Sequence, residues 1–129
     1  MNRVVCGARL DVPENKDIQE RTFRFAVRIL KLVRSLPFDP AGSAVARQLA
    51  RSGTGVGANI EEAQGSHSKK EFIRRMNIAR SEARETLYWL RLVAETELLA
   101  RDRLREITNE ADELVRILTT IVKRSRNHE

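Results

Sequence analysis

The sequence predicts an all-α protein, an antiparallel up-and-down four-helix bundle. In four long segments, apolar residues recur at alternating spacings of three and four, which places each set on one face of a helix. No segment alternates apolar and polar residues for long enough to form a strand. The segments are separated by short connections, so successive helices should run antiparallel.

The composition limits the class of protein. The chain has 129 residues, the length of one domain, with 33% charged and 41% hydrophobic residues. This apolar fraction excludes a fully disordered chain, and Arg or Lys interrupts every apolar stretch well before the roughly 18 residues of a transmembrane helix. The single cysteine, Cys6, cannot form an internal disulfide, and the first residues show no signal-peptide pattern. We therefore expect a cytoplasmic protein without membrane contact.

The first helix is predicted over residues 15–36, because Pro37 closes it and a row of six residues lines its inner face. This row is Ile18, Thr22, Phe25, Ile29, Leu32 and Leu36. Phe23, Val27 and Leu30 add a second apolar flank, which widens the apolar arc beyond half of the helix. We expect this flank to be an interface with another copy of the chain. The alternative is that a few apolar side chains simply stay exposed.

The second helix is predicted over residues 40–65, with Asp39 as the N-cap, Pro40 at the first helical position and Gly65 at its end. Its core row is Val45, Leu49, Ser52, Val56, Ile60 and Ala63. Three glycines within residues 53–57 suggest a phosphate loop, but the lysine of a Walker motif and a preceding strand are missing. The small residues therefore indicate close packing against a neighbouring helix.

A helix-turn-helix is the lesser alternative for residues 45–62, with Gly53 at the turn. Its would-be recognition helix, residues 55–62, has no Arg or Lys for phosphates or bases and carries two acids that DNA would repel. We therefore rank a DNA-binding regulator of this type low.

The third helix is predicted over residues 69–97 and begins with a capping box, in which Ser68 accepts from the Glu71 amide and Glu71 reaches back. Its core row is Phe72, Met76, Ala79, Ala83, Thr86, Leu90 and Val93. The fourth helix is predicted over residues 102–125, after a less distinct turn. Its core row is Leu104, Ile107, Ala111, Leu114, Leu118 and Ile121.

The four helices form one domain, residues 15–125. Residues 1–14 are predicted to be a flexible N-terminal arm, and residues 126–129 a frayed C-terminus.

Two pairs of glutamates have the i, i+3 spacing found in di-iron bundles, Glu82 with Glu85 and Glu110 with Glu113. Such sites need Glu-x-x-His on two helices, and neither of the two histidines follows a glutamate at that spacing. We expect these acids to form salt bridges with nearby arginines instead, namely Arg80, Arg84 and Arg116. Because the histidines are also too peripheral to activate a nucleophile, we expect no metal, no cofactor and no enzymatic activity.

The basic residues are more ordered than the acids. Lys and Arg total 24 against 18 Asp and Glu, and residues 1–36 alone hold eight of the former and four of the latter. The first helix carries a basic stripe, Arg21, Arg24, Arg28 and Lys31. The third helix carries basic residues on one face with Tyr88, namely Lys70, Arg74, Arg84 and Arg91. Such stripes attract phosphates and carry no base information, so we expect binding of RNA or DNA without sequence readout. The alternative is a structural or protein-interaction scaffold whose charge only confers solubility.

Three stretches resemble the 23S rRNA intervening-sequence proteins, a family of small four-helix bundles. They are residues 52–62, which end in Gly-Ala-Asn-Ile-Glu-Glu, residues 68–73, Ser-Lys-Lys-Glu-Phe-Ile, and residues 78–86, Ile-Ala-Arg-Ser-Glu-Ala-Arg-Glu-Thr. Shorter matches at residues 88–90 and 114–118 extend the resemblance over most of the chain.

The resemblance implies an antiparallel bundle that assembles as a ring-like homopentamer. The similar accessory variability determinant proteins of diversity-generating retroelements bind nucleic acid and a reverse transcriptase, which makes both candidate partners. Polar positions of the family correspond to four residues here, Asn59, Glu62, Glu82 and Glu85. For these we expect a hydrogen-bonded structural cluster between the second and third helices.

Overall fold

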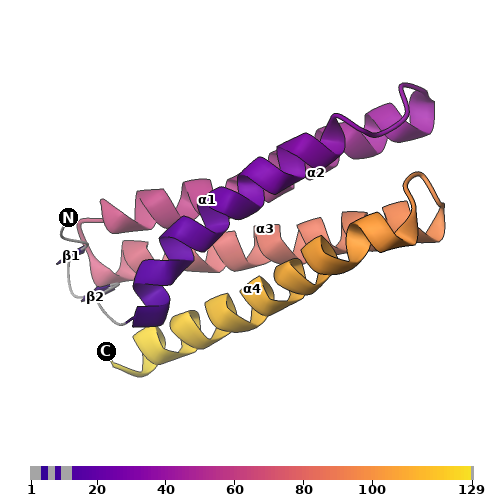
Figure 1. The fold of residues 1–129 in the computed structure, drawn as a ribbon. Helices are drawn as coiled ribbons and strands as arrows, with labels where there is room; N and C mark the ends of the chain where they lie inside the picture. The colour runs from indigo at the N-terminus through magenta and orange to yellow at the C-terminus, as the bar shows by residue number, and fades with distance from the viewer. Residues whose placement is uncertain (1–3, 6–7, 10–12, 129) are drawn as a thin grey trace.

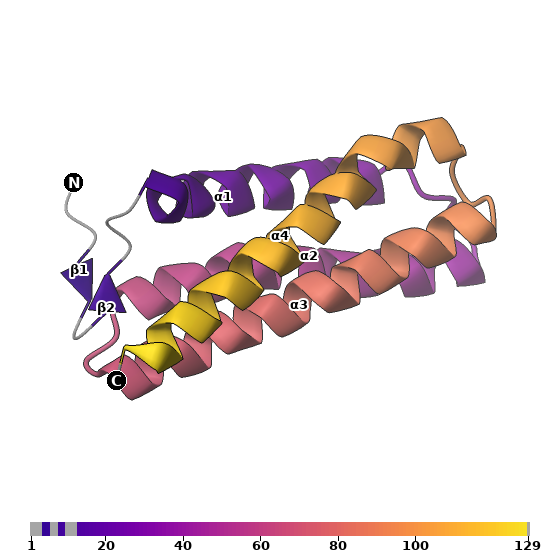
Figure 2. The same ribbon diagram turned by 90° about the horizontal axis from the view of Figure 1, so that it is seen from below.

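An antiparallel up-and-down bundle of four helices is seen in the computed structural model, which describes residues 4–5, 8–9 and 13–128 (Figure 1). The helices are α1 (Pro13–Val33), α2 (Pro40–Gln64), α3 (Lys69–Glu95) and α4 (Arg101–Asn127). Each helix packs along the next one in the chain, whereas α1 and α4 touch much less. The start of α1 and the end of α4 lie at the same end of the bundle (Figures 1 and 2). The all-α prediction is therefore confirmed.

Three predicted helix ends need correction. α3 ends at Glu95, two residues before the predicted residue 97. α1 ends at Val33, and the amides of Ser35 and Leu36 bond to carbonyls three residues back in a tighter turn. The steric demand of the following Pro37 on the residue before it explains why the helix does not continue to residue 36. α4 runs to Asn127, so residues 126 and 127, predicted to be frayed, are helical.

Part of the predicted flexible arm, residues 1–14, has regular structure. Val4–Val5 (β1) pairs antiparallel with Ala8–Arg9 (β2), and α1 already begins at Pro13. The other positions of that arm, with Cys6 among them, lie outside the described residues.

The predicted core rows are confirmed, because every member is buried, from Ile18 at 0% exposure to Leu36 at 9%. The polar members of these core rows form hydrogen bonds. The hydroxyls of Thr86 and Ser52 lie 2.8 Å apart between α3 and α2, and Thr22 donates to the Ile18 carbonyl at 2.7 Å. No helix in the described part of the chain is both long enough and apolar enough to cross a membrane.

The predicted N-caps of α2 and α3 are confirmed. The Asp39 carboxylate accepts from the amide of the third helical residue at 2.7 Å, and Ser68 Oγ accepts from the Glu71 amide at 3.1 Å. The reciprocal half of the capping box is wrong, because the Glu71 carboxylate binds two arginines of its own helix instead. Gly65 caps the end of α2 as predicted.

The glycine-rich segment of α2 is a site of close helix packing. A Cβ on Gly53 would lie 2.7 Å from Cγ2 of Ile29, and one on Gly57 would lie 3.2 Å from the Thr22 carbonyl oxygen. The two glycines are about one turn apart and so let the α2 backbone approach α1. The helix is continuous through this segment, which excludes the helix-turn-helix at residues 45–62.

The connection between α3 and α4 is a Schellman motif without its usual glycine. Glu97 has a left-handed φ of 58°, its amide bonds to the Ala94 carbonyl, and the Leu98 amide bonds to the Val93 carbonyl. The turn was indistinct in the sequence because glutamate stands where glycine is preferred.

Candidate nucleic-acid interface

The basic stripe predicted on α1 faces α4, and its first member is already engaged. Arg21 binds Glu110 through two nitrogens, at 3.0 Å from Nε and 2.7 Å from Nη2, and Glu113 lies 3.0 Å from Nη2. The hydrogen bond with Glu110 is the main reason that the pKa of Arg21 is raised, although partial burial opposes it. Arg21, predicted to bind nucleic acid, therefore has its charge offset by two carboxylates of α4. Its guanidinium ties α1 to α4.

The rest of the stripe lines a groove between α1 and α4, which holds two hollows of about 410 and 320 Å³. Arg24, Arg28 and Lys31 form the α1 wall, and Arg103 projects from α4. With Arg21, the groove has five cations and as many carboxylates, which are Glu20, Asp102, Glu106, Glu110 and Glu113. The charges in this α1–α4 groove therefore cancel, and it attracts phosphate less than the sequence suggested.

The outer face of α3 carries cations that have no matching acids. Lys70, Arg84 and Arg91 are exposed, and no described carboxylate lies within 4 Å of any of them. At 100° per residue, these three and Tyr88 fall within about 60° of the helix circumference. The 21 residue steps from Lys70 to Arg91 span about 31 Å at 1.5 Å per step. We call these four residues the α3 basic face.

The acids of α3 are each bound to an arginine and leave the charge of this face intact. Glu71 lies 2.9 Å from Arg74 and 3.2 Å from Arg75, and the hydrogen bond with Arg74 is the main reason that the pKa of Glu71 is lowered. The other three acids pair with arginines of α2 and α4, namely Glu82, Glu85 and Glu95. Arg74 was predicted to bind nucleic acid. It is exposed, but its charge is largely offset by Glu71.

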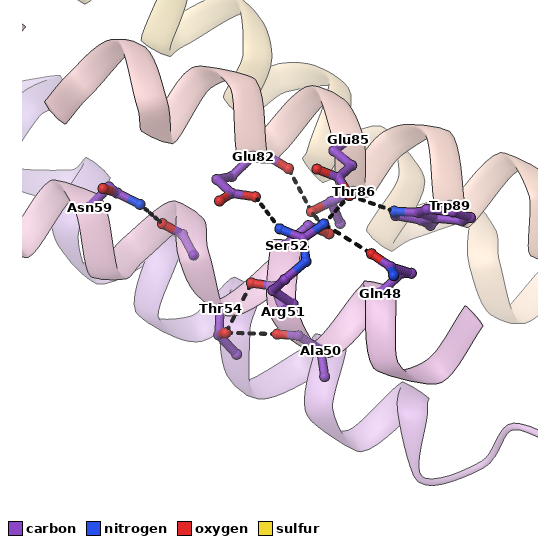
Figure 3. Close-up of polar contacts among 11 residues, drawn as sticks. Gln48, Ala50, Arg51, Ser52, Thr54, Asn59, Glu82, Glu85, Thr86 and Trp89 are labelled. Carbon is purple, nitrogen blue, oxygen red and sulfur yellow. Dashed lines mark hydrogen bonds and ion pairs between the residues drawn. The ribbon is translucent and has the colours of Figure 1, made fainter. Parts of the chain in front are cut away.

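The polar cluster between α2 and α3 is centred on Arg51, a residue that sequence reasoning missed (Figure 3). Its guanidinium donates to Glu82 at 3.3 Å, to Gln48 at 3.0 Å and to Glu85. Glu85 also accepts from Trp89 Nε1 at 3.0 Å. These contacts tie α2 to α3 on the outside of the bundle and give Glu82 and Glu85 a structural role.

The arginines predicted to pair with the four spaced glutamates do not do so. Arg116 pairs with Asp112 at 2.6 Å. Within the described part of the chain, the exposed Arg84 has no carboxylate partner and the buried Arg80 Nε has no hydrogen-bond partner. The partners, Arg51 and Arg21, come from neighbouring helices instead.

Asn59 belongs to a separate cluster. Its Nδ2 donates to the Gly55 carbonyl at 2.8 Å, and its Oδ1 accepts from Arg75 at 3.2 Å. Glu62 is exposed and its carboxylate forms no hydrogen bond or ion pair in the described part of the chain, although its carbonyl accepts from Ser66 and Gly65, so Glu62 does not belong to the predicted polar cluster. Sequence reasoning did not single out Arg75, although its position four residues after Glu71 is the spacing of an ion pair within a helix.

Comparison with known proteins agrees with the four-helix fold. Residues 14–120 match the family described as 23S rRNA-intervening sequence protein. The chain belongs to this family. It is also similar to a solved structure, a protein with unknown function from the S23 ribosomal protein family of Bacteroides thetaiotaomicron. The two are 39% identical with a TM-score of 0.77, over 82% of this chain and 98% of that one. No curated protein matches the chain.

This member of the 23S rRNA-intervening sequence protein family carries exposed apolar surface on α1. The side chains of Phe23, Val27 and Leu30 are 65%, 37% and 45% exposed, which agrees with their predicted place outside the core. Phe38, in the connection after α1, is fully exposed and was missed, although an aromatic residue between two prolines was a visible signal.

The described surface of the family member offers charge and three exposed aromatic side chains, Phe23, Phe38 and Tyr88, of which Tyr88 lies among the cations of α3. Within residues 4–5, 8–9 and 13–128, no three His, Cys, Asp or Glu side chains are grouped so that they could hold a metal ion. The α3 basic face is the candidate interface, because cations on a rigid helix bind phosphates by electrostatic attraction.

Proposed function

We propose that this protein is a cytoplasmic, non-enzymatic homo-oligomer that binds the phosphate backbone of RNA or DNA through the α3 basic face. The observation that carries the proposal is the absence of carboxylate partners, among the described residues, for the exposed Lys70, Arg84 and Arg91. A cation without a partner neutralises a phosphate and releases counterions without first breaking an ion pair. In the α1–α4 groove, Arg28 and Lys31 also form no ion pair, but the carboxylates that line the groove offset the attraction of its cations for phosphate.

This surface suits binding without sequence readout. Long basic side chains on the outside of a helix reach phosphates, which are the same for every sequence. Repetition of the face in each copy of an oligomer would multiply the number of contacts, so a modest charge per chain would give useful affinity.

The proposed oligomer forms through the apolar flank of Phe23, Val27 and Leu30, and by analogy with the family it is a homopentamer. Exposed apolar residues of this size, three in a row on one helix, are typical of contact surfaces. α1 and α3 lie diagonally across the bundle, since both pack along α2, and α4 packs along α3 with only light contact to α1. Association through α1 therefore leaves the α3 basic face free for nucleic acid.

A charge-removal comparison tests the binding surface. The test variant replaces the three cations of the α3 basic face by glutamine, and the matched control removes the same charge from the α1–α4 groove, as Arg24→Gln, Arg28→Gln and Lys31→Gln. Fluorescence anisotropy with labelled RNA and DNA at low salt should show a large loss of affinity for the test variant and a smaller loss for the control. If the test variant bound as tightly as the wild type, the α3 basic face would not be the binding surface. If the wild type did not bind at all, the scaffold alternative would be favoured.

A second experiment tests assembly. Replacing Phe23 and Val27 by glutamate should give a smaller species, because charge buried in an interface without a partner is costly. Sedimentation velocity should show a multiple of the 14.8 kDa chain mass for the wild type. A wild type that sediments as a monomer at micromolar concentration would contradict the proposed interface.

A further inference from the structure

Tyr88 is an exposed aromatic ring set among the cations of the α3 basic face. Its side chain is 56% exposed. Arg84 lies four residues before it and Arg91 three residues after it, about 6 Å and 4.5 Å along the helix axis. Phosphate contacts need only the cations, so a nucleic acid that bound through its phosphates alone would not use the exposed ring.

The ring is held in place by its neighbours. Tyr88 and Trp89 form a T-shaped pair with ring centroids 5.0 Å apart and an interplanar angle of 76°. Trp89 is half-buried and donates its indole N–H to Glu85, which Arg51 also binds. In an edge-to-face pair, the edge of one ring points at a single face of the other ring. Trp89 can therefore cover no more than one face of Tyr88, and at least one face is left open.

We infer that the α3 basic face binds single-stranded nucleic acid, with an unpaired base stacked on Tyr88 and the flanking phosphates on Arg84 and Arg91. This inference rests on the proposed function and narrows it. Bases of a duplex are paired and stacked on one another, whereas an unpaired base can lie on a ring. A cationic track with an aromatic platform is the combination by which proteins bind single strands without sequence preference.

Replacement of the ring tests this inference directly. The test variant is Tyr88→Ala, and Tyr88→Phe is the matched control that keeps the aromatic face. Short oligo(dT) and oligo(rU) represent the two sources of single strand, and a mixed-sequence DNA duplex is the comparison ligand. The alanine variant should lose about fivefold or more of its single-strand affinity, whereas the phenylalanine variant should keep it and duplex binding should be unchanged in both. The relative affinities of oligo(dT) and oligo(rU) show whether the strand is DNA or RNA.

Tryptophan fluorescence gives a second readout at the same place. Trp89 is the only tryptophan of the chain, and its ring lies beside Tyr88, so single strands should change its emission. Equal single-strand affinity for the alanine and phenylalanine variants would overturn the stacking role, even if loss of the three cations still weakened binding. Absence of wild-type binding to every ligand would overturn the proposed function as well. A reduced oligomer mass for Tyr88→Ala would make the ring a protein contact and also overturn the inference.

Discussion

Replacement of Gly53 by alanine tests the close approach of α1 and α2. The added Cβ would lie 2.7 Å from Cγ2 and 2.9 Å from Cγ1 of Ile29, well inside ordinary carbon contact. Overpacking of this kind costs about 1–3 kcal/mol. Alanine is favoured over glycine within a helix by about 1 kcal/mol. We therefore expect Gly53→Ala to lower the free energy of unfolding by up to about 2 kcal/mol.

A double-mutant cycle separates the cost of overpacking from the gain in helix propensity. Ile29→Ala should itself cost about 2–5 kcal/mol, because Ile29 is fully buried. It also removes Cγ1 and Cγ2 and leaves only the Cβ of residue 29, which would lie 3.0 Å from the added Cβ. Gly53→Ala should therefore be less destabilising in the Ile29→Ala background than in the wild type, because most of the steric cost is gone and the helix-propensity gain of about 1 kcal/mol remains. Urea unfolding of the wild type, the two single variants and the double variant measures this difference. All four are compared at one protein concentration, because the stability of an oligomer depends on concentration.

Gly65→Ala is the matched control for this cycle. Its Cβ would meet nothing nearer than the Glu62 carbonyl oxygen at 3.8 Å, so its effect should stay within about 0.5 kcal/mol. If Gly53→Ala had the same effect on the wild type as on the Ile29→Ala protein, the contact with Ile29 would not restrict this position and the packing argument would be refuted.

Three further substitutions or titrations follow from the structure. Arg21→Gln should lower the free energy of unfolding by about 1–2 kcal/mol, because Glu110 is left partly buried without its cation; unchanged urea unfolding would contradict this. Glu97→Gly should raise the free energy of unfolding by about 0.5–1 kcal/mol, because glycine adopts the left-handed φ without strain. A lower melting temperature of this variant would contradict the prediction. The pKa of Glu71 should lie below the ordinary glutamate value and rise towards it in Arg74→Gln, followed by NMR titration of the carboxyl carbon. The stabilisation from ionised Glu71 is then complete above the unfolded-state pKa and is lost as the pH falls through the lowered folded-state pKa, and equal titration in both proteins would disprove it.

The core and the helix ends could be predicted because they depend on position within one helix. Spacing alone shows that Phe25 and Leu114 point inward, and both are buried. Likewise, Asp39 and Ser68 cap helices through bonds to amides only three residues away. These are local interactions, which a single sequence displays directly.

The ion pairs could not be predicted, because they depend on which helix lies beside which. The position of Arg21 on its helix shows that it lies off the core, but only the packed bundle shows that this side faces Glu110. The same holds for Arg51, whose carboxylate partners lie more than 30 positions away in the sequence.

Tertiary packing also explains the indistinct third turn. Glu97 takes a left-handed conformation that glutamate disfavours, and the following Leu98 and Leu99 pack against the core. Burial of these two side chains compensates for the strain at Glu97.

The central claim is that free cations on α3 bind phosphate, and the salt dependence of binding tests it most directly. The logarithm of the association constant should fall linearly with the logarithm of the salt concentration for the wild type. Replacing Lys70, Arg84 and Arg91 by glutamine should make that slope shallower by about one for each residue, or about three in all. An unchanged slope in this variant, or wild-type binding that does not respond to salt, would contradict the account.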